Sequence, residues 1–489
     1  MSAQTFPNSP MGLPASLKFD LPPSMSDSAR SYSVNVSPDG QTSVVGGANT
    51  ATPYVANSTG AFGNFTAQNI SFTIPSGMSD SVFMDTSHTT VSFVLTYTVT
   101  GIMTGSVAAS CNLIGSGSSF IDTLTCYSNN QPLETINQYG LLSNFLLNNT
   151  VNASERFGGI SVALGADSNS NNGIDLATTA GTYRYSFCLP LISVIGVNTT
   201  DKLFPVGSVN NLQLVLGTAN VLPVVSYCTT VPSAQPVIGA FTLSEFQLNM
   251  KYIDVGDLSA QMLRQTLQNG KWYLRSSTYT NSSVNIPVGT NGAVQSLLQI
   301  RNTSVRSIFH QYGITASAVC PNGLYDAINP ALTSRQCQIS GNFYPNRPLR
   351  DSQCPAEAYP YLIQSLGGGL TKSLGTVVNR SNYNAVIPSI PSGSDSTLVV
   401  PASGLRAAVA GGDETQTIIS KFPNMAYYGY DLEKSAGILF QGVNTRASPP
   451  FLNTIFGVAS TSNITCQAWG LSDLVLEIDV NAKQITPYI

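Results

Sequence analysis

The chain has 489 residues, which is too long for one ordinary hydrophobic core and predicts about two or three domains. Charged residues make up only 9% of it and the net charge is -4, so we expect a polar but nearly uncharged surface. No run of basic residues occurs, which excludes a dedicated arm that binds DNA or RNA through its phosphates.

Residues 1–60 are rich in Pro, Ser, Gly and Asn and show no periodicity. They are interpreted as a flexible tail or as an arm that becomes ordered against neighbouring subunits. Met1–Leu17 lacks the cationic start and apolar core of a secretory signal, and no apolar run approaches the ~20 residues of a membrane span. We therefore expect a soluble intracellular chain, whose eight cysteines, without any C-x-x-C pair, are free buried thiols.

Alternating apolar and β-branched residues predict a series of strands in the first half of the chain. The clearest segments are 69–74, 91–99, 183–185, 212–216 and 243–248. Pro132-Leu133 leads into a segment with Ile136, Tyr139 and Leu146-Leu147, which predicts one short helix. Asp257 to Gly270 is the clearest helix, because Asp257 can cap its start, Gly270 can end it, and its leucines form one apolar side.

The second half of the chain repeats the first. Six short segments recur in unbroken order, with spacings that drift only where loops could lengthen or shrink. The pairs are Ile74-Pro75-Ser76-Gly77 with Ile286-Pro287-Val288-Gly289, Val91–Leu95 with Val305–Phe309, Asn130-Gln131-Pro132-Leu133 with Asn346-Arg347-Pro348-Leu349, Tyr183–Tyr185 with Tyr428–Tyr430, Gly196–Thr199 with Gly442–Thr445, and Leu243–Leu248 with Leu471–Leu476. This order indicates one fold present twice.

Each half is about 200 residues of short strands and turns, which is too long for an immunoglobulin-like sandwich and suits an eight-stranded jelly roll. We therefore predict an all-β protein of two tandem eight-stranded jelly rolls, with short helices in loops. The predicted domains are an N-terminal arm (1–60), a first jelly roll (61–256), a linker helix (257–270) and a second jelly roll (271–489). A further helix is predicted to begin close to Pro360, since proline is tolerated only in the first turn, and to plug one end of a barrel.

Catalysis by a nucleophile and a histidine would have to use His88 or His310, the two histidines of the chain. His88 lies in a Ser/Thr-rich turn and His310 ends an alternating strand. Neither is accompanied by a G-x-S-x-G elbow or a cysteine-protease signature. The sequence therefore predicts no enzyme and no catalytic residue.

No metal or cofactor site is predicted. Asp167–Gly173 resembles the start of an EF-hand loop, but Asn172 stands where glycine is required and Thr178 where a bidentate Glu is required. Cys320, Cys337 and Cys354 are too far apart to form zinc-ligand pairs. There is no P-loop and no dinucleotide-binding glycine motif after a strand. A chain of this size with two rolls and no chemical site is interpreted as a building block.

A set of short segments recurs in a fixed order over roughly residues 65 to 489. They are Ile74-Pro75 with Phe83-Met84-Asp85, Ile286-Pro287 with Thr303–Phe309, Gly341–Pro345 with Pro348 and Glu357-Ala358-Tyr359, Tyr430–Glu433 with Gly442–Thr445, and Asp473–Ile478. In these segments the chain resembles the double jelly-roll major capsid proteins, in particular those of virophages and of polinton-like and adintovirus-type DNA viruses. It departs from the family at Arg306 and His310.

This resemblance implies a homotrimer whose six barrels form a pseudo-hexagonal tile of the icosahedral shell of a double-stranded DNA virus. It implies neighbouring capsomers, penton and minor capsid proteins as partners, synthesis in the host cell cytoplasm and a final location in the virion. The loops within 150–180 and 350–427 are expected among those that face outward. Two other interpretations stay open. One is a carbohydrate-binding or adhesive β-sandwich, such as a viral fibre or lectin, and the other is a β-sandwich hydrolase.

Overall fold

The fold is taken from a computed structural model of the chain. It describes residues 29–39, 54–56, 69–99, 110–114, 116–156, 158–165, 173–176, 181–199, 202–219, 224–227, 238–265, 267, 270–315, 325, 327–330, 332–351, 355–367, 376, 378, 383, 425–433, 440–460 and 463–488. The EF-hand-like segment Asp167–Asn172, Cys320, Cys354 and most of the expected loop 350–427 lie outside these residues.

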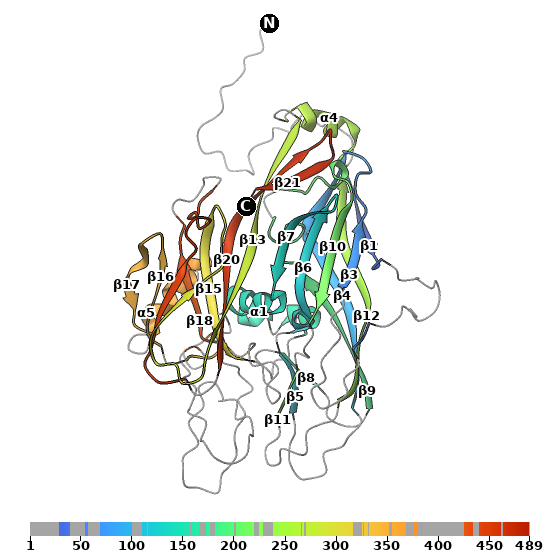
Figure 1. Cartoon of the computed structure of the whole chain (residues 1–489). Helices are drawn as coiled ribbons and strands as arrows, with labels where there is room; N and C mark the ends of the chain where they lie inside the picture. Colours follow the sequence, from blue (N-terminus) through green and yellow to red (C-terminus); the bar gives the residue numbers. More distant parts are fainter. Residues whose placement is uncertain are drawn as a thin grey trace, which may run out of the picture.

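The first half of the chain forms two antiparallel sheets that enclose a hydrophobic core (Figure 1). One runs in the order β1-β12-β4-β9, with β2 also paired to β12, and the other in the order β3-β10-β6-β7. The bounds are β1 Arg30–Val36, β2 Tyr54–Ala56, β3 Asn69–Ile74, β4 Val82–Val99, β6 Ile121–Ser128, β7 Gln131–Asn137, β9 Gly181–Pro190, β10 Leu212–Thr218 and β12 Ile238–Asp254. A separate small sheet has the order β11-β5-β8, with bounds Val224–Tyr227, Ser110–Ile114 and Gly173–Leu176.

The second half forms another pair of antiparallel sheets beside the first (Figure 1). One runs β13-β20-β15-β18, with β21 also paired to β20, and the other runs β14-β19-β16-β17. The bounds are β13 Lys271–Ile286, β14 Gly292–Leu297, β15 Val305–Ile314, β16 Leu332–Ile339, β17 Asn342–Leu349, β18 Tyr427–Asp431, β19 Phe451–Phe456, β20 Ile464–Asp479 and β21 Gln484–Tyr488.

The two halves have the same strand order. In both, the first, third, sixth and eighth of the eight principal strands form one sheet and the other four form the second. Thus β1, β3, β4, β6, β7, β9, β10 and β12 correspond in chain order to β13–β20. Each half is an eight-stranded jelly roll, so the predicted fold of two tandem jelly rolls is confirmed.

Five of the six predicted sequence matches fall on corresponding strands or on the loops that follow them. The match of Ile74-Pro75-Ser76-Gly77 with Ile286-Pro287-Val288-Gly289 is wrong, because Ile74 ends β3 and Ile286 ends β13, whose counterpart is β1. An isoleucine followed by proline and glycine is a general signal for the end of a strand, and it recurs at positions that are not equivalent.

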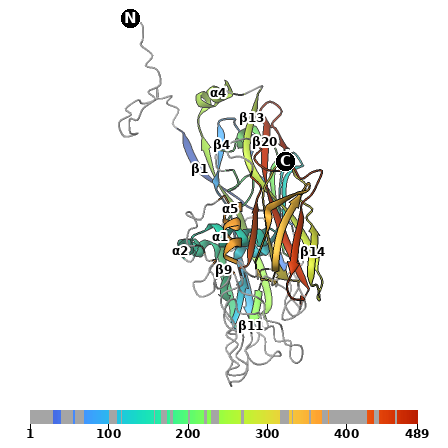
Figure 2. The same ribbon diagram turned by 90° about the vertical axis from the view of Figure 1, so that its left-hand side faces the viewer.

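Short helices occupy the connections: α1 Tyr139–Thr150, α2 Ala153–Arg156, α3 Gly159–Leu164, α4 Asp257–Gln265 and α5 Pro355–Ser365. The helix predicted after Pro132-Leu133 begins only at Tyr139, because Ile136 lies in β7, and the helix predicted over 257–270 ends at Gln265. The predicted start of α5 close to Pro360 is wrong. The helix begins at Pro355, in the first helical position that proline favours, and tolerates Pro360 in its interior. Viewed from the side, α1, α2 and α5 lie on one side of the molecule and β14 on the other (Figure 2).

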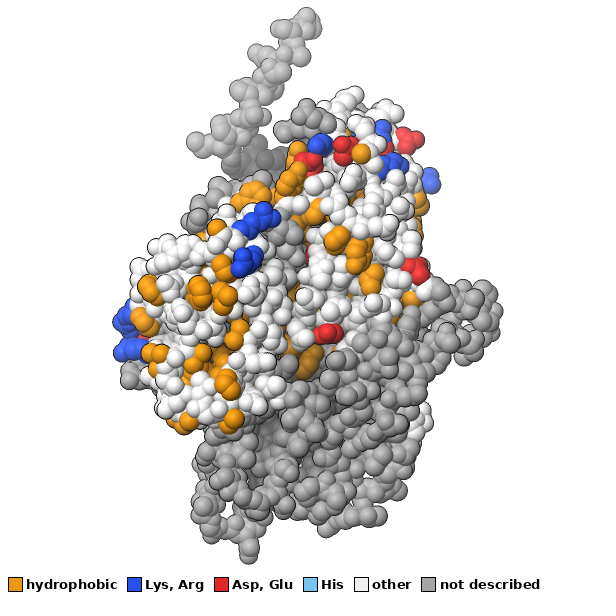
Figure 3. All heavy atoms as spheres, in the orientation of Figure 1, with side chains coloured by type: hydrophobic (Ala, Val, Ile, Leu, Met, Phe, Trp, Pro, Cys, Tyr) orange, Lys and Arg blue, Asp and Glu red, His pale blue; other side chains and the backbone are white. Residues whose placement is uncertain are grey.

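β1 and β2 lie within residues 1–60, and β1 pairs with β12 over its whole length. The domain boundaries at residues 60, 256 and 270 stay a prediction. On the face shown in Figure 3, charged side chains are sparse over the described surface and scattered hydrophobic ones lie between uncharged polar groups. Among the described residues, no helix is both long and apolar enough to cross a membrane.

Candidate functional site

Helix α1 lies between the two rolls (Figure 1). It follows β7 of the first roll, and its Phe145 packs against an aromatic cluster on the second roll. The ring centroid of Phe145 lies 5.1 Å from that of Phe309 on β15, 5.0 Å from Tyr427 on β18 and 6.0 Å from Trp469 on β20. All four side chains are buried. Aromatic pairs stabilise beyond their buried area, so Phe145 makes α1 an apolar contact between the rolls.

Two buried hydrogen bonds between the rolls also help to fix their relative position. The amide of Asn148 donates a hydrogen bond at 2.9 Å to the hydroxyl of Tyr427. After β9, the hydroxyl of Thr199 donates at 2.7 Å to that of Ser276 on β13. These groups are buried, and a misplaced partner would leave a buried polar atom unsatisfied, so they favour one arrangement of the two rolls.

Glu134 is a buried carboxylate at the same junction. Its Oε1 accepts hydrogen bonds from the backbone N–H of Val194, at 2.7 Å, and from the hydroxyl of Ser193. Its Oε2 accepts from the hydroxyl of Thr278 on β13, at 3.4 Å. Burial raises the pKa of Glu134 to about 7, although the three hydrogen bonds oppose this shift. The junction therefore contains a carboxyl that titrates near neutral pH.

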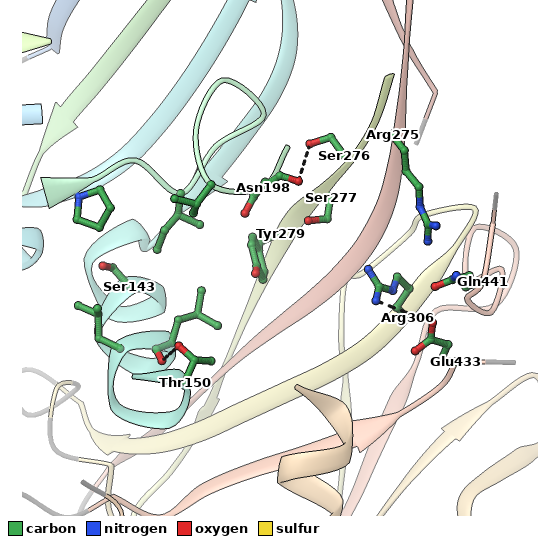
Figure 4. Close-up of a pocket in the computed structure, with 15 residues that line it drawn as sticks. Ser143, Thr150, Asn198, Arg275, Ser276, Ser277, Tyr279, Arg306, Glu433 and Gln441 are labelled. Carbon is green, nitrogen blue, oxygen red and sulfur yellow. Dashed lines mark hydrogen bonds and ion pairs between the residues drawn. The ribbon is translucent and has the colours of Figure 1, made fainter. Parts of the chain in front are cut away.

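A pocket of about 660 Å³ opens beside α1, with walls from both rolls (Figure 4). Ser143 and Thr150 come from α1, Asn198 from the loop after β9, and Ser276 and Tyr279 from β13. Arg275, Arg306, Glu433 and Gln441 line the opposite end in Figure 4.

Asp473 on β20 contacts three of the residues at the charged end of this pocket. Its Oδ2 accepts hydrogen bonds from the hydroxyl of Ser304, at 2.6 Å, and from the backbone N–H of Gln441, at 2.7 Å. Its Oδ1 lies 3.4 Å from Nη2 of Arg275 and 3.8 Å from Nε of Arg306. Asp473 is fully buried, and Arg306 also lies 3.9 Å from Glu433. Two arginines thus face two carboxylates, and this charge balance is typical of a structural junction.

Neither histidine belongs to the junction or to a catalytic arrangement. His88 is exposed, and both Asp85 and Ser87 approach the same ring nitrogen, Nδ1, at 2.8 and 3.0 Å. A catalytic triad needs the acid and the nucleophile on opposite ring nitrogens, so this cluster cannot relay a proton from Ser87 to Asp85.

His310 lies inside the second roll, against Tyr428 and Tyr430. Burial and nearby Arg335 hold the pKa of His310 well below its ordinary value, so the ring is neutral. Arg335 lies over Tyr428 at 4.5 Å and pairs with Asp351 at 2.9 Å. We interpret the cluster as a polar element of the core of this roll.

Cys337, one of the three cysteines considered for zinc, is buried in the core of the second roll, and burial raises the pKa of its thiol to about 12. A protonated thiol among apolar side chains is a poor metal ligand. Within the described ranges, no three His, Cys, Asp or Glu side chains come together in a group that could hold a metal ion.

Sequence reasoning missed the junction residues Phe145, Glu134 and Asp473. One signal was available for Glu134, because it is a charged residue between the apolar Leu133 and Ile136 of a strand whose core-facing residues are otherwise apolar. Phe145 carries no such signal, since nearly every residue of α1 is buried and its partner could have been either roll.

No protein-family model and no curated protein sequence matches the chain. Solved structures do match. The major capsid protein of mavirus is 10% identical with a TM-score of 0.51, over 99% of this chain and 97% of its own. A chain of the Sputnik virophage, solved by cryo-EM, is 13% identical with a TM-score of 0.51, over 92% and 90%. VP54 of PBCV-1, fitted into a reconstruction of Sputnik, is 10% identical with a TM-score of 0.51, over 94% and 97%. Together with the strand order described above, these matches place the chain in the double jelly-roll fold of viral major capsid proteins.

Proposed function

We propose that the chain is the major capsid protein of an icosahedral double-stranded DNA virus and that three copies assemble into a pseudo-hexagonal capsomer. The fold of the whole chain matches a mavirus major capsid protein and PBCV-1 VP54 over almost their full lengths. A role in a shell requires a rigid tile with repeated contacts, and it requires no catalytic site.

The observation that carries the proposal is the junction at α1. Two rolls of the same strand order are held by Phe145, by the hydrogen bond between Asn148 and Tyr427, and by Glu134. A chain that presents two similar barrels in a fixed relation can place six barrels in a ring of three copies. Such a ring is nearly hexagonal, and hexagonal tiles cover flat facets.

The proposed partners are other copies of the chain, neighbouring capsomers, and penton and minor capsid proteins. We propose that the protein is synthesised in the host cell cytoplasm and that the finished protein is located in the virion. The low content of charged residues supports this role, because a surface of uncharged polar groups can contact other copies without a large cost of burying charge.

The test is to express the full chain and to measure its mass by light scattering, with particle images recorded by electron microscopy. A capsomer has three times the chain mass of 51.6 kDa and shows a pseudo-sixfold outline. A stable monomer that binds sugars on a glycan array would instead support the adhesive β-sandwich and would overturn the capsid proposal.

A further inference from the structure

The pocket beside α1 has chemically different walls (Figure 4). Helix α1 and the loop after β9 contribute apolar side chains, which are those of Leu146, Leu147, Ile192 and Val197. The opposite end carries the guanidinium groups of Arg275 and Arg306 (Figure 4). The volume of about 660 Å³ lies within the range of about 300–1,000 Å³ that is typical of sites for small molecules. A molecule that fills this pocket would meet apolar walls at one end and two cations at the other.

The two arginines have hydrogen-bond donors that the described part of the chain does not use. Nη2 of Arg275 makes one long hydrogen bond, to Oδ1 of Asp473 at 3.4 Å. Nε of Arg306 is buried without a hydrogen-bond partner, and its Nη2 lies 3.9 Å from Glu433, which is beyond hydrogen-bond distance. A guanidinium carries several N–H donors in a planar fork that matches a carboxylate. The charged end of the pocket is therefore suited to bind a further carboxylate.

A third residue of the lining has an unused donor as well. Nδ2 of Asn198 is buried and has no hydrogen-bond partner, although the large majority of buried polar atoms in folded proteins have one. Asn198 lies in the loop after β9, whereas Arg306 lies on β15 of the second roll. Unused donors thus occur on both rolls around one pocket, and this arrangement indicates a molecule with acceptor oxygens.

The charges around the pocket allow one added carboxylate. Asp473 is fully buried and accepts two hydrogen bonds, so it stays in place. Glu433 is 26% exposed and only weakly paired with Arg306, so its carboxylate can turn into water at a small cost. A carboxylate from outside the chain can then replace Glu433 beside Arg306, and two arginines still face two carboxylates.

We propose that this pocket binds a small amphipathic carboxylate of the chemical class of a fatty acid. Its acid group lies at Arg306 and Arg275, and its apolar chain lies against Leu147 and Ile192. This binding goes beyond the proposed function and does not depend on it, because the pocket is formed within one chain. Since the walls come from both rolls, the bound molecule would also stabilise the folded chain against unfolding.

The first experiment measures the binding of decanoate to the full chain by isothermal titration calorimetry, below the concentration at which decanoate forms micelles. The comparison probes are 1-decanol and decyltrimethylammonium, which have the same apolar chain with a neutral or a cationic head. We expect saturable binding of one decanoate per chain, at least about tenfold tighter than either comparison probe, because only the carboxylate accepts charge-assisted hydrogen bonds. Decanoate should also raise the melting temperature.

Two substitutions change the charged end of the pocket. Arg306→Gln removes a cation and should weaken decanoate binding at least about tenfold. The matched control is Arg301→Gln, because Arg301 is an exposed arginine of the same roll that does not line the pocket, and it should leave binding unchanged. Glu433→Gln removes the carboxylate that competes for Arg306 and should strengthen decanoate binding severalfold.

A further substitution fills the pocket and leaves every ion pair in place. Ser277 lines the pocket from β13, so Ser277→Trp should abolish decanoate binding. Ser283→Trp is its control, since Ser283 is an exposed serine of the same strand outside the pocket. Circular dichroism verifies that each variant is folded. If Arg306→Gln does not fold, Glu433→Gln and Ser277→Trp still decide the question.

The outcomes separate this inference from the proposed function. Wild-type protein without saturable decanoate binding, or with equal binding of decyltrimethylammonium, overturns the inference and leaves the capsid proposal standing. Decanoate binding that folded Arg306→Gln or folded Ser277→Trp leaves unchanged also overturns it, because the molecule would then lie elsewhere. Binding that both variants weaken and both controls keep supports the inference. A chain that binds decanoate in this way but stays monomeric overturns only the proposed capsomer.

Discussion

Glu134 of the first roll accepts a hydrogen bond from the hydroxyl of Thr278 of the second roll, at 3.4 Å, and both residues are buried. This carboxyl is thus a direct link between the rolls. Its pKa in the folded protein is raised from an ordinary 4.5 to about 7, with burial as the main cause. The folded state therefore binds a proton more tightly than the unfolded state does.

A pH dependence of stability follows from this shift. Because the folded pKa lies above the unfolded one, the contribution of Glu134 is fully present below about pH 4.5 and is lost as the pH rises through 7. The loss is on the order of 3 kcal/mol between pH 4.5 and pH 8. Glu134→Gln mimics the protonated carboxyl, so its melting temperature should fall less than that of the wild type over this range. Parallel melting curves of the two proteins against pH would contradict this role of Glu134.

Phe145→Ala should uncouple the two rolls. The change removes the ring that packs on Phe309, Tyr427 and Trp469, and such truncations in a core cost about 3–5 kcal/mol. Because the lost contact joins the rolls, we expect calorimetry to show two transitions where the wild type shows one. Leu146→Ala, at the neighbouring and less buried position, serves as the control and should keep a single transition.

Asp351→Asn should destabilise the second roll strongly, because it leaves the fully buried guanidinium of Arg335 without its counter-charge. Removing one partner of a buried ion pair costs about 3–5 kcal/mol. The comparison is Arg347→Ala, which breaks an exposed pair with Glu357 and should cost less than about 1 kcal/mol. Urea denaturation measures the loss in the free energy of unfolding for both variants. Similar losses for the two variants would show that the buried pair has no special role.

Asp473→Asn should weaken the charged end of the junction pocket. The carboxylate accepts hydrogen bonds from Ser304 and from the backbone of Gln441 and faces Arg275 and Arg306. Since both arginines are partly exposed, water can compensate in part, and we expect a loss of about 1–3 kcal/mol in the free energy of unfolding. Glu433→Gln affects a contact with Arg306 that is longer and more exposed than the contacts of Asp473. This substitution should change the free energy of unfolding by less than about 1 kcal/mol. A larger loss in the free energy of unfolding for Glu433→Gln than for Asp473→Asn would contradict the role of Asp473 in the charged end of the pocket.

The duplication could be predicted from the sequence because corresponding strands keep the same order along the chain and a similar content of apolar, aromatic and β-branched residues. Val91–Leu95 and Val305–Phe309 lie on the corresponding strands β4 and β15, in the middle of their sheets. The match nevertheless sets Leu95, which faces the core of the first roll, against Phe309, which packs on Phe145 outside the core of the second. The predicted match of the segment at Ile74 with the segment at Ile286 was wrong because it reflects only how a strand ends. Local turn chemistry recurs at many places in one fold, so it is a poor guide to equivalence.

The junction could not be predicted in the same way. Phe145 lies in a helix whose residues are almost all buried. The periodicity of apolar residues therefore does not show which side of this helix contacts the second roll. The link between Glu134 and Thr278 joins positions 144 residues apart, and only the packing of one roll on the other brings them together. The start of α5 was missed because Pro360 was treated as a barrier, although a helix can lose one hydrogen bond when its buried side chains, such as Leu362, are well packed.

The connection from β12 through α4 to β13 makes the two barrels parts of one molecule. A tethered partner is present at an effective concentration on the order of millimolar, whatever the abundance of the protein in the cell. A six-barrel assembly made from such pairs requires three molecules to meet, whereas single barrels would require six. Half of the contacts between neighbouring barrels in this assembly would then form within one chain and would be independent of dilution. Expression level would control only the other half, which form between chains.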